Sequence, residues 1–221
     1  IITGTSRGIG YELALQFANA GHQVLAISRK TPKELIENPN ITCLSIDISN
    51  PEELLQVENF INRTWKKVDV LIHNAGSLLH KQFTQITSEE FQNIYKVNVF
   101  AVAELTKICI PFMEKGSHVV TISSMGGIQG SMKFAGLAAY SSSKGAVITL
   151  SELLAEEYKE QGISFNVLAL GSVQTEMLAE AFPGYQAPIS ANEMAKYIYE
   201  FTLNGHKYFN GKILPVSSTN P

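Results

Sequence analysis

A glycine-rich turn near the start of the chain places the strongest constraint on its fold. Residues 3–10 read Thr-Gly-Thr-Ser-Arg-Gly-Ile-Gly and join a strand-like pair at residues 1–2 to an amphipathic helical segment at residues 11–20. Such a turn presents free backbone N–H groups at the positive end of a helix dipole, where a pyrophosphate binds. The spacing is Gly-x-x-x-Gly-x-Gly instead of the usual dinucleotide pattern Gly-x-Gly-x-x-Gly, and a lone glycine cluster is equally often an ordinary tight turn. The strand–helix–strand pattern that follows favours the phosphate site.

Alternating apolar strands and amphipathic helices predict a fold of the α/β class. Strands are expected at residues 1–2, 23–28, 41–46, 68–73, 117–123, 163–170 and 211–216. Helices are expected at residues 11–20, 51–66, 140–161 and 190–203, and residues 88–114 form one long helix or two in succession. Continuous apolar strands are typical of a parallel sheet that is covered on both faces. We therefore predict a Rossmann-type, doubly wound sheet of seven parallel strands with helices on both faces. No linker or repeat appears, so residues 1–221 are expected to form a single dinucleotide-binding domain that carries the cofactor and substrate sites, with its first strand truncated at the N-terminus.

Local signals predict how two of these helices begin and which connections lack regular structure. Ser49 stands shortly before Pro51-Glu52, which predicts an N-cap at Ser49, and Ser190 with Glu193 predicts a capping box. Residues 31–40 contain two prolines and leave room for only a short helix, whereas residues 125–137 and 171–186 are expected to be irregular connections.

Composition and charge exclude several classes of function. The chain has 221 residues, 45% of them hydrophobic, and a net charge of −3 without a basic run, so no nucleic-acid partner is expected. No apolar run reaches the roughly 18 residues that a membrane span needs. Cys43 and Cys109 lie far apart in apolar stretches, which indicates buried thiols in a reducing compartment and a cytoplasmic location. The histidines show no metal-ligand spacing, and the start at Ile1 without a methionine leaves an upstream signal open.

The residues after the second predicted strand indicate which dinucleotide the chain binds. In a dinucleotide fold this position faces the adenosine ribose, where an acidic residue binds the 2′-hydroxyl. Here the chain has Ser28, Arg29 and Lys30, and Arg7 in the glycine turn approaches from the other side. Because arginine binds phosphate through paired, charge-assisted hydrogen bonds, this pattern favours NADP(H) over NAD(H). The alternative is that Arg29 and Lys30 are solvated loop charges.

Three further strand ends bring polar or small residues to the same edge of the sheet. Asp47, followed by Ile48, either accepts a hydrogen bond from the adenine amino group or is a turn aspartate, and the two roles are compatible. The Asn-Ala-Gly sequence at residues 74–76 lets adenine and ribose approach the backbone closely, and Gly171 follows the sixth strand. Since the carboxyl ends of parallel strands meet at one edge, we expect one cleft to collect these residues.

A tyrosine and a lysine four residues apart are the candidate proton-transfer groups. Tyr140 and Lys144 lie one turn apart on one helix face, and Ser124 stands at the end of the fifth strand. The ammonium is expected to lower the phenol pKa from ~10, and a drop of ~3 units corresponds to about 4 kcal/mol. A Tyr-x-x-x-Lys pair alone is common by chance. The catalytic interpretation is favoured here because the pair occurs together with Ser124 and the glycine-rich turn. Asn98, a polar residue in an apolar helix, is either a structural clamp between backbone groups or part of a proton path.

Together these motifs resemble the short-chain dehydrogenase/reductase family, of the compact type, over essentially the whole chain. The residues that carry the resemblance are Thr3 to Gly10, Asp47, Asn74 to Gly76, Asn98, Ser124, Tyr140, Lys144, Asn166, Gly171 and Thr175. The resemblance implies a nicotinamide-dependent oxidoreductase that acts on a carbonyl or an alcohol. It implies that Tyr140 is the acid/base and that Ser124 holds the substrate oxygen. It also implies that Lys144 lowers the tyrosine pKa and binds the nicotinamide ribose, and that Asn98 holds a water between Lys144 and solvent.

The resemblance further implies a set of cofactor contacts and an oligomer. The set contains Gly4, Ser6, Arg7, Gly8, Ile9, Gly10, Ser28, Arg29, Asp47, Ile48, Asn74, Ala75, Gly76, Tyr140, Lys144, Gly171, Val173 and Thr175, and no metal ligand. Members of the family usually form tetramers in which the helices that hold Asn98 and Tyr140 pack against their copies. We therefore expect a homo-oligomer, a tetramer or a dimer.

Three departures from the family pattern leave the catalytic set intact. Leu170-Gly171 replaces a Pro-Gly pair, the gap of 16 residues from Ser124 to Tyr140 enlarges the loop beside the substrate, and residues 217–221 lack a Gly-Gly ending. We expect NADPH-dependent reduction of a small or medium carbonyl compound to an alcohol. The alternatives are an NAD-dependent alcohol dehydrogenase and a non-catalytic dinucleotide-binding sensor. Substrate identity and reaction direction stay open, because the substrate pocket is built from variable loops.

Overall fold

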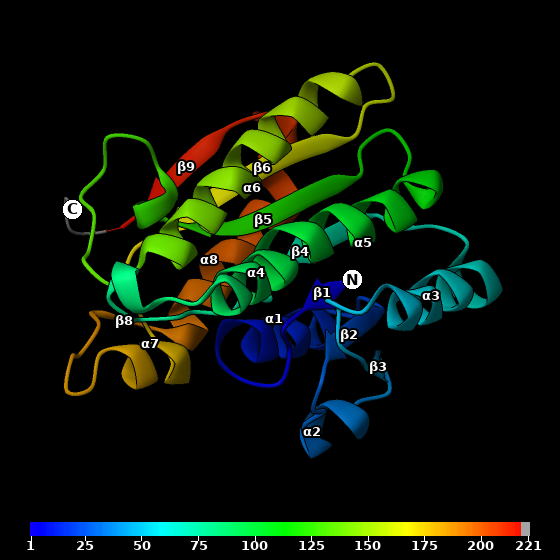
Figure 1. Cartoon of the computed structure of the whole chain (residues 1–221). Coiled ribbons are helices and arrows are strands. Elements are labelled where there is room, and N and C mark those ends of the chain that lie inside the picture. Colours follow the sequence, from blue (N-terminus) through cyan, green and yellow to red (C-terminus); the bar gives the residue numbers. More distant parts are fainter. Residues whose placement is uncertain (218–221) are drawn as a thin grey trace.

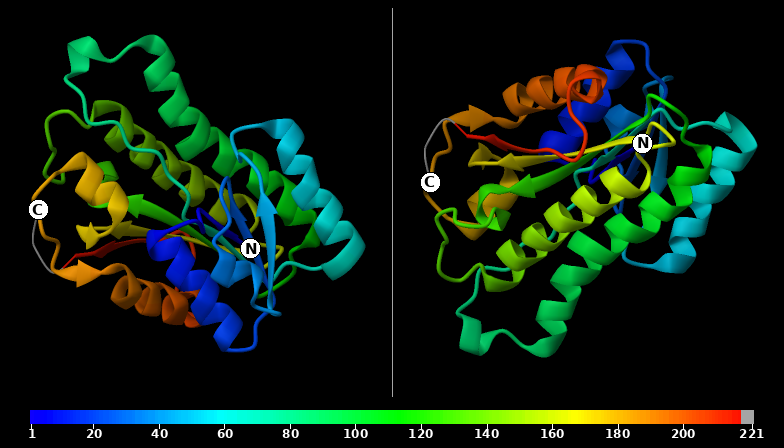
Figure 2. Two further views of the ribbon diagram at one scale, coloured as in Figure 1. Left: turned by 90° about the horizontal axis from the view of Figure 1, so that it is seen from below. Right: turned by 90° about the horizontal axis from the view of Figure 1, so that it is seen from above.

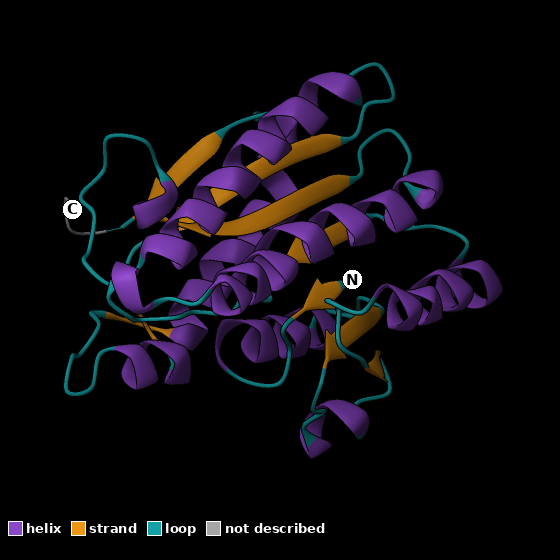
Figure 3. Ribbon diagram, in the orientation of Figure 1, coloured by secondary structure: helices purple, strands orange, loops and turns teal. Residues whose placement is uncertain are grey.

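The computed structural model describes residues 1–217 and shows a seven-stranded parallel sheet covered by helices on both faces (Figures 1 and 3). The strand order is β3-β2-β1-β4-β5-β6-β9. The strands are β1 (Ile2–Thr3), β2 (Val24–Ser28), β3 (Ile41–Ser45), β4 (Val70–His73), β5 (His118–Ser124), β6 (Ser164–Leu170) and β9 (Ile213–Val216). The predicted doubly wound sheet of seven parallel strands is therefore confirmed. The chain reverses its winding between β1 and β4, the crevice at which such folds bind ligands.

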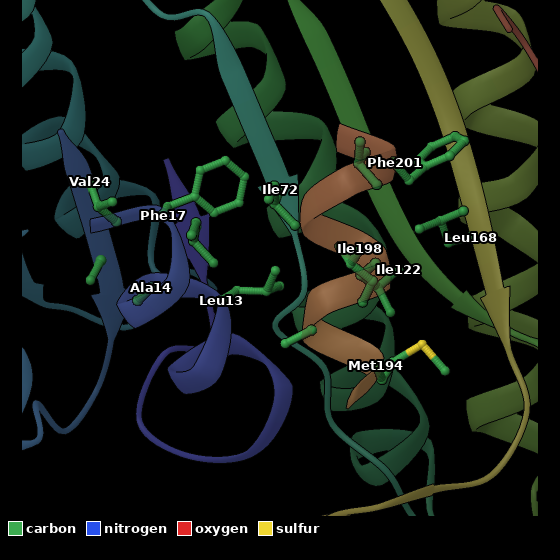
Figure 4. Packing of buried hydrophobic residues seen from close by; sticks show 14 of the residues in the cluster. Leu13, Ala14, Phe17, Val24, Ile72, Ile122, Leu168, Met194, Ile198 and Phe201 are labelled. Carbon is green, nitrogen blue, oxygen red and sulfur yellow. The ribbon is translucent and has the colours of Figure 1, made fainter. Parts of the chain in front are cut away.

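Helices on the two faces enclose separate apolar layers (Figure 2). The helices are α1 (Gly8–Asn19), α2 (Lys33–Ile36), α3 (Pro51–Phe60), α4 (Ser88–Tyr95), α5 (Ala101–Cys109), α6 (Ala138–Glu157), α7 (Glu176–Ala181) and α8 (Ala191–Asn204). Leu13 and Phe17 of α1 belong to one apolar cluster with Met194 and Ile198 of α8 and with Ile72 of β4, and Figure 4 shows these side chains between the helices and the sheet. Residues of α3, α5 and α6 cover the opposite face, among them Leu54, Leu105 and Ala155.

The longest pairing in the sheet fixes where two candidate site segments lie. β5 and β6 pair from His118 with Ser164 to Ser124 with Leu170, seven residues in register. Ser124 and the Leu170-Gly171 corner consequently reach the carboxyl edge of the sheet together. Both strands are almost wholly buried, which agrees with the apolar residues that each presents on both faces.

The connection expected at residues 171–186 contains regular structure that the sequence did not indicate. β7 (Val173–Gln174) pairs in parallel with β8 (Ile189–Ser190), and α7 lies between them. The helix predicted at residues 51–66 ends in a π-helical turn at Ile61–Trp65. Residues 88–114 contain two helices in succession, as one of the two alternatives had it, and a π-helical turn at Lys96–Phe100 joins them. The capping box of Ser190 and Glu193 is confirmed.

The predicted N-cap at Ser49 is wrong. The side chain of Asn50 caps α3, accepting a hydrogen bond from the Glu52 N–H at 3.0 Å. Ser49 instead donates through its N–H and its hydroxyl to Asp47 Oδ1, at 2.9 and 2.7 Å. Both residue types are good caps, and the neighbouring carboxylate decides between them. The departure noted at the chain's C-terminus falls mainly on residues 218–221, which lie outside the described residues.

Candidate active site

The ends of β1 and β4 are tied together at the edge of the sheet that carries the site. Thr3 Oγ1 accepts hydrogen bonds from the N–H groups of Asn74 and Ala75, at 3.1 and 3.0 Å. Asn74 Nδ2 donates to the carbonyl oxygens of Thr3 and Gly4, at 3.0 and 3.3 Å. The Asn-Ala-Gly segment therefore holds the glycine turn in place, a role that the sequence did not reveal.

Two glycines let this turn fold against its surroundings. Gly4 has φ +75°, and a Cβ there would lie 2.7 Å from Ala75 Cα. A Cβ on Gly10 would lie 2.3 Å from the Gly4 carbonyl oxygen and 2.4 Å from Asn74 Nδ2. Real Cβ atoms essentially never come this close, so the shape of the turn requires glycine at both positions.

The turn offers what a pyrophosphate needs. No side chain of the described residues caps the N-terminus of α1, and its first turn contains no acidic residue. Its first N–H groups therefore lack side-chain acceptors and carry the positive end of the helix dipole. A cavity of about 540 Å³ lies in front of it, between Ser6 and Gly8 on one wall and Gln174 and Thr175 on the other. These features fit the phosphates of a dinucleotide.

The adenosine end of the expected site is partly engaged in local contacts. Ser28 Oγ accepts from the Thr5 hydroxyl at 3.3 Å and donates to the Lys30 carbonyl oxygen at 2.7 Å. Burial would raise the pKa of Asp47, but the two hydrogen bonds from Ser49 and the nearby Arg29 guanidinium hold it below its usual range. Asp47 is thus a turn aspartate, the second of the two roles considered for it.

Arg7 lies in a different place from the one that the sequence suggested. Its guanidinium pairs with both carboxylate oxygens of Glu180 on α7 instead of turning toward Ser28. Arg29 and Lys30 are exposed, and neither forms an ion pair with an acidic side chain within residues 1–217.

The candidate proton-transfer groups converge beyond the end of β5. Lys144 Nζ lies 5.9 Å from the centroid of the Tyr140 ring and donates to the carbonyl oxygen of Ile122 at 2.8 Å. The Ser123 hydroxyl donates to the Lys144 carbonyl oxygen at 2.8 Å, which ties α6 to β5. Sequence reasoning missed this role of Ser123, although the residue adjoins Ser124.

The charges of these groups differ from the sequence-based expectation. Burial lowers the pKa of Lys144 to about 8. Burial raises the pKa of Tyr140, and a hydrogen bond with Ser124 offsets part of that rise. The expectation of a lowered tyrosine pKa is therefore wrong, because burial of the phenol disfavours its anion more than the neighbouring groups stabilise it.

Asn98 acts as a clamp in the structure. It is 1% exposed and lies in the π-helical turn before α5. Its Oδ1 accepts from the Ser77 N–H at 2.7 Å, and its Nδ2 donates to the Ser77 carbonyl oxygen and to Ser143 Oγ, both at 2.9 Å. The Ser143 hydroxyl in turn donates to the Tyr140 carbonyl oxygen at 2.7 Å. Asn98 thus links the loop after β4 to the helix that carries Tyr140.

The segment after β6 completes the wall opposite the glycine turn. Gly171 N–H donates to the Val216 carbonyl oxygen at 2.9 Å, Val173 is buried in β7, and Thr175 caps α7 by accepting from the Leu178 N–H at 3.2 Å. A Cβ on Gly76 would approach Lys144 Nζ to 3.5 Å, so Gly76 keeps the space beside the lysine open. Residues 1–217 contain no cluster of three or more possible metal ligands and no helix long and apolar enough to cross a membrane.

Comparison with known proteins agrees with this geometry. The family model described as short chain dehydrogenase matches residues 1–186. An NADPH-dependent pterin aldehyde reductase of Arabidopsis thaliana is 31% identical over 201 residues, which cover 85% of this chain and 81% of that protein. The 3-oxoacyl-acyl-carrier-protein reductase FabG of Escherichia coli K12 is 28% identical, with 98% of this chain and 94% of that protein covered.

Solved structures share the fold. A short chain dehydrogenase of Burkholderia cenocepacia J2315 in complex with NADP superposes with a TM-score of 0.85 at 22% identity, over 99% of this chain and 96% of that one. A short chain dehydrogenase of Salmonella enterica serovar Typhi gives a TM-score of 0.85 at 27% identity, over 97% and 93%. Together with the turn, the Tyr140–Lys144 helix and the match over residues 1–186, this shows that the chain belongs to the short-chain dehydrogenase/reductase family of oxidoreductases.

Proposed function

We propose that the protein is an NADPH-dependent oxidoreductase that reduces a small or medium carbonyl compound to an alcohol. The observation that carries the proposal is the convergence of Ser124, Tyr140 and Lys144, with Lys144 Nζ fixed on the Ile122 carbonyl oxygen at 2.8 Å. In this proposal the two hydroxyls and the buried cation act on a substrate that lies in the crevice where folds of this kind bind their ligands.

In this proposal the protein supplies position and a proton. The bound nicotinamide supplies the hydride. The hydroxyls of Ser124 and Tyr140 donate to the substrate oxygen as it becomes negative, and Tyr140 then gives it the phenolic proton. The Lys144 ammonium stabilises the phenolate that is left. Asn98 is a positioning residue, because it holds the Ser77 backbone and the helix of Tyr140 together.

The preference for NADP(H) rests on the residues after β2. Arg29 and Lys30 stand where an acidic residue would bind a ribose hydroxyl, and both are exposed. The Arabidopsis relative named above is NADPH-dependent. The remaining cofactor contacts are proposed at the glycine turn, Asp47-Ile48, Asn74 to Gly76, and Gly171, Val173 and Thr175.

The surroundings of the site support a medium-sized substrate and an oligomer. The enlarged loop exposes Met132 and Phe134, which are 53% and 52% exposed and give the substrate side an apolar margin. Phe100, directly before α5, and Leu153, on α6, are also exposed. We propose that copies of the chain pack against these two helices to form a dimer or tetramer. We further propose one domain for both sites and a cytoplasmic location, in keeping with the two unpaired cysteines, Cys43 and Cys109.

The test is Tyr140→Phe. Turnover of a carbonyl panel should vanish while NADPH titrated against the protein still binds, because only the phenolic proton is removed. Turnover that persists would end the assignment of Tyr140 as the proton donor. Tight NADPH binding without turnover of any carbonyl by the wild type would favour the sensor.

One observation favours a second candidate, an NAD-dependent alcohol dehydrogenase. The Arg7 guanidinium is paired with Glu180 and is therefore not turned toward a 2′-phosphate. In the described chain this leaves Arg29 and Lys30, after β2, to bind such a phosphate. Replacing Arg29 with alanine should weaken NADPH far more than NADH if the proposed preference holds. Equal weakening of both dinucleotides would favour the dehydrogenase.

A further inference from the structure

The cavity in front of the glycine turn is closed on its far side by α7. Ser6, Arg7 and Gly8 form the near wall, whereas Thr175, Glu176 and Ala179 form the far wall. A Cβ placed on Gly8 would lie 3.5 Å from Glu176 Oε2 and from Thr175 Cγ2. The first turn of α7 therefore stands directly opposite the backbone proposed to bind the pyrophosphate.

An ion pair joins the two walls. Arg7 Nη1 lies 2.5 Å from Glu180 Oε1, and Arg7 Nη2 lies 3.1 Å from Glu180 Oε2. Glu176 and Glu180 are four residues apart on α7, on the same face of the helix. The pKa of Arg7 is raised, first by its hydrogen bond to Glu180 and further by the charges of Glu180 and Glu176. Two carboxylates thus face one guanidinium at the mouth of a site that takes an anionic ligand.

The ion pair with Glu180 occupies the same N–H groups of the Arg7 guanidinium that would bind a phosphate. A guanidinium binds a carboxylate or a phosphate through the same pair of parallel N–H groups, so one fork serves one anion at a time. Arg29 lies near enough to Asp47 for its charge to lower the pKa of that carboxyl, but it forms no ion pair or hydrogen bond with an acidic side chain of residues 1–217, so its fork of N–H groups is not occupied in this way. Of the two arginines proposed to bind the 2′-phosphate, Arg7 is thus paired with a carboxylate and Arg29 is not.

We propose that Glu180 is a specificity-determining residue whose carboxylate competes with the 2′-phosphate of the cofactor for Arg7. The inference rests on the proposed NADP(H) site. Binding of NADPH draws Arg7 away from Glu180 and so releases the tie between α7 and the glycine turn. NADH has no 2′-phosphate and leaves the pair in place. Glu180 consequently reduces the preference for NADPH and couples the position of α7 to the phosphate that distinguishes the two dinucleotides.

The expected effect is modest because the pair is open to solvent. The side chains of Arg7 and Glu180 are 47% and 64% exposed. Exposed ion pairs of this kind change an equilibrium by about two- to fivefold. That range is measurable by titration of the cofactor's fluorescence.

The experiment compares Glu180→Gln with wild type by titrating each protein with NADPH and with NADH. The substitution keeps the shape of the side chain and removes its charge. The NADPH dissociation constant should fall by about two- to fivefold, whereas that of NADH should stay within about 1.5-fold. In an Arg7→Ala background, Glu180→Gln should leave NADPH binding unchanged, because the residue that both anions share is absent.

A matched control separates pairing from general charge. Glu12 lines the same cavity and accepts a hydrogen bond from Asn192 Nδ2 at 2.6 Å, without contacting Arg7. Glu12→Gln should therefore tighten NADPH less than Glu180→Gln does. An equal gain in both variants would overturn the inference, as would equal tightening of NADPH and NADH in Glu180→Gln.

The failure of the inference is distinguishable from the failure of the proposed function. Wild type that binds neither dinucleotide would overturn the proposed function and the inference with it. Wild type that binds NADPH tightly, with a Kd unchanged in Glu180→Gln, would overturn the inference alone.

Discussion

Lys144 Nζ donates a 2.8 Å hydrogen bond to the carbonyl oxygen of Ile122, two residues before Ser124 on β5. The bond fixes a buried cation 5.9 Å from the Tyr140 ring by anchoring it to the backbone of the sheet. A flexible lysine is thereby held at one position relative to the phenol, at the price of burying its charge. The lowered pKa of Lys144, about 8, is the sign of that burial.

Lys144→Met should lower carbonyl reduction by about 10²–10⁴-fold, since the phenolate left by Tyr140 loses its neighbouring cation. In wild type the ammonium is present below its pKa of about 8, so the rate should fall as the pH rises through 8. Steady-state kinetics measured from about pH 6 to about pH 10, roughly two pH units on either side of the Lys144 pKa, would show both effects. Lys159, an exposed lysine paired with Glu156, offers the control: Lys159→Met should leave the profile unchanged. A wild-type rate that stays flat through pH 8 would remove Lys144 from the proton transfer.

Gly10→Ala should destabilise the protein even though alanine is the better helix former. Helix propensity favours alanine by about 1 kcal/mol, but the added Cβ meets the Gly4 carbonyl oxygen at 2.3 Å, and that oxygen belongs to a turn fixed by Asn74. We expect a net loss of about 2 kcal/mol in the free energy of unfolding and at least tenfold weaker NADPH binding. Urea unfolding and cofactor titration measure these quantities.

The contrast for Gly10 is Gly21, which has φ +88° and no atom of residues 1–217 within 4 Å of a Cβ. Gly21→Ala should cost about 1 kcal/mol of backbone strain and leave NADPH binding intact. Equal effects of the two substitutions on NADPH binding would show that the turn tolerates a side chain at Gly10.

Asn98→Ala tests whether this residue is a clamp. The substitution leaves the N–H and carbonyl of Ser77 and the hydroxyl of Ser143 without their partner, and we expect a loss of about 3 kcal/mol in the free energy of unfolding. Asn204 is exposed; its Nδ2 donates to the Glu200 carbonyl oxygen and its Oδ1 accepts from the ammonium of Lys207. Because both bonds are exposed to water, Asn204→Ala should change stability by less than about 0.5 kcal/mol. If Asn98→Ala impairs turnover but keeps wild-type stability, the residue serves a proton path instead.

The main sheet was predictable from the sequence because its longer strands carry apolar residues on both faces, as in the Val24–Ile27 part of β2. β5 and β6 are nearly all buried, and burial on both faces is what produces this pattern. β7 and β8 have two residues each, too few for any periodicity, and they pair across the intervening α7. The π-helical turn that presents Asn98 inward was also invisible, since its sequence continues the helical pattern on either side.

The candidate site was predictable to the extent that its residues follow strand ends. The ion pairs and pKa values of the site could not be predicted in this way. The contact between Arg7 and Glu180 joins residues 173 positions apart, and nothing in the local sequence of either one signals the other. The pKa of Tyr140 was expected to fall on the strength of one neighbouring charge, yet burial acts in the opposite direction, and the depth of a side chain is set by the packing of the whole fold.

His118 should make the protein sensitive to acid between pH 6.5 and 4. The ring is 1% exposed; its Nδ1 lies 2.8 Å from the Thr202 carbonyl oxygen and its Nε2 lies 3.0 Å from Asn166 Nδ2. The Thr202 carbonyl oxygen can only accept a hydrogen bond and the Asn166 amide nitrogen can only donate one, so the network fits the neutral tautomer with its proton on Nδ1. Burial lowers the pKa of His118 to about 4, against a partial rise from the bond to Thr202.

The sign of the pH dependence follows from that shift. The unfolded chain takes up a proton at His118 near pH 6.5, and the folded protein resists it until about pH 4. The resulting stability is fully present above pH 6.5 and is lost as the pH falls to 4, by up to about 3 kcal/mol. The buried His73, whose pKa is lowered to about 3, adds a similar slope over the same window. His118→Gln should therefore remove about half of the slope of urea-measured stability across this window, while the exposed His22→Gln should retain the wild-type slope. Because Asp47 and Glu90 have lowered pKa values, they add their own losses mainly below the window. An unchanged slope in His118→Gln would assign the acid sensitivity to other groups. The buried His73, whose pKa is about 3, would then be the first residue to replace.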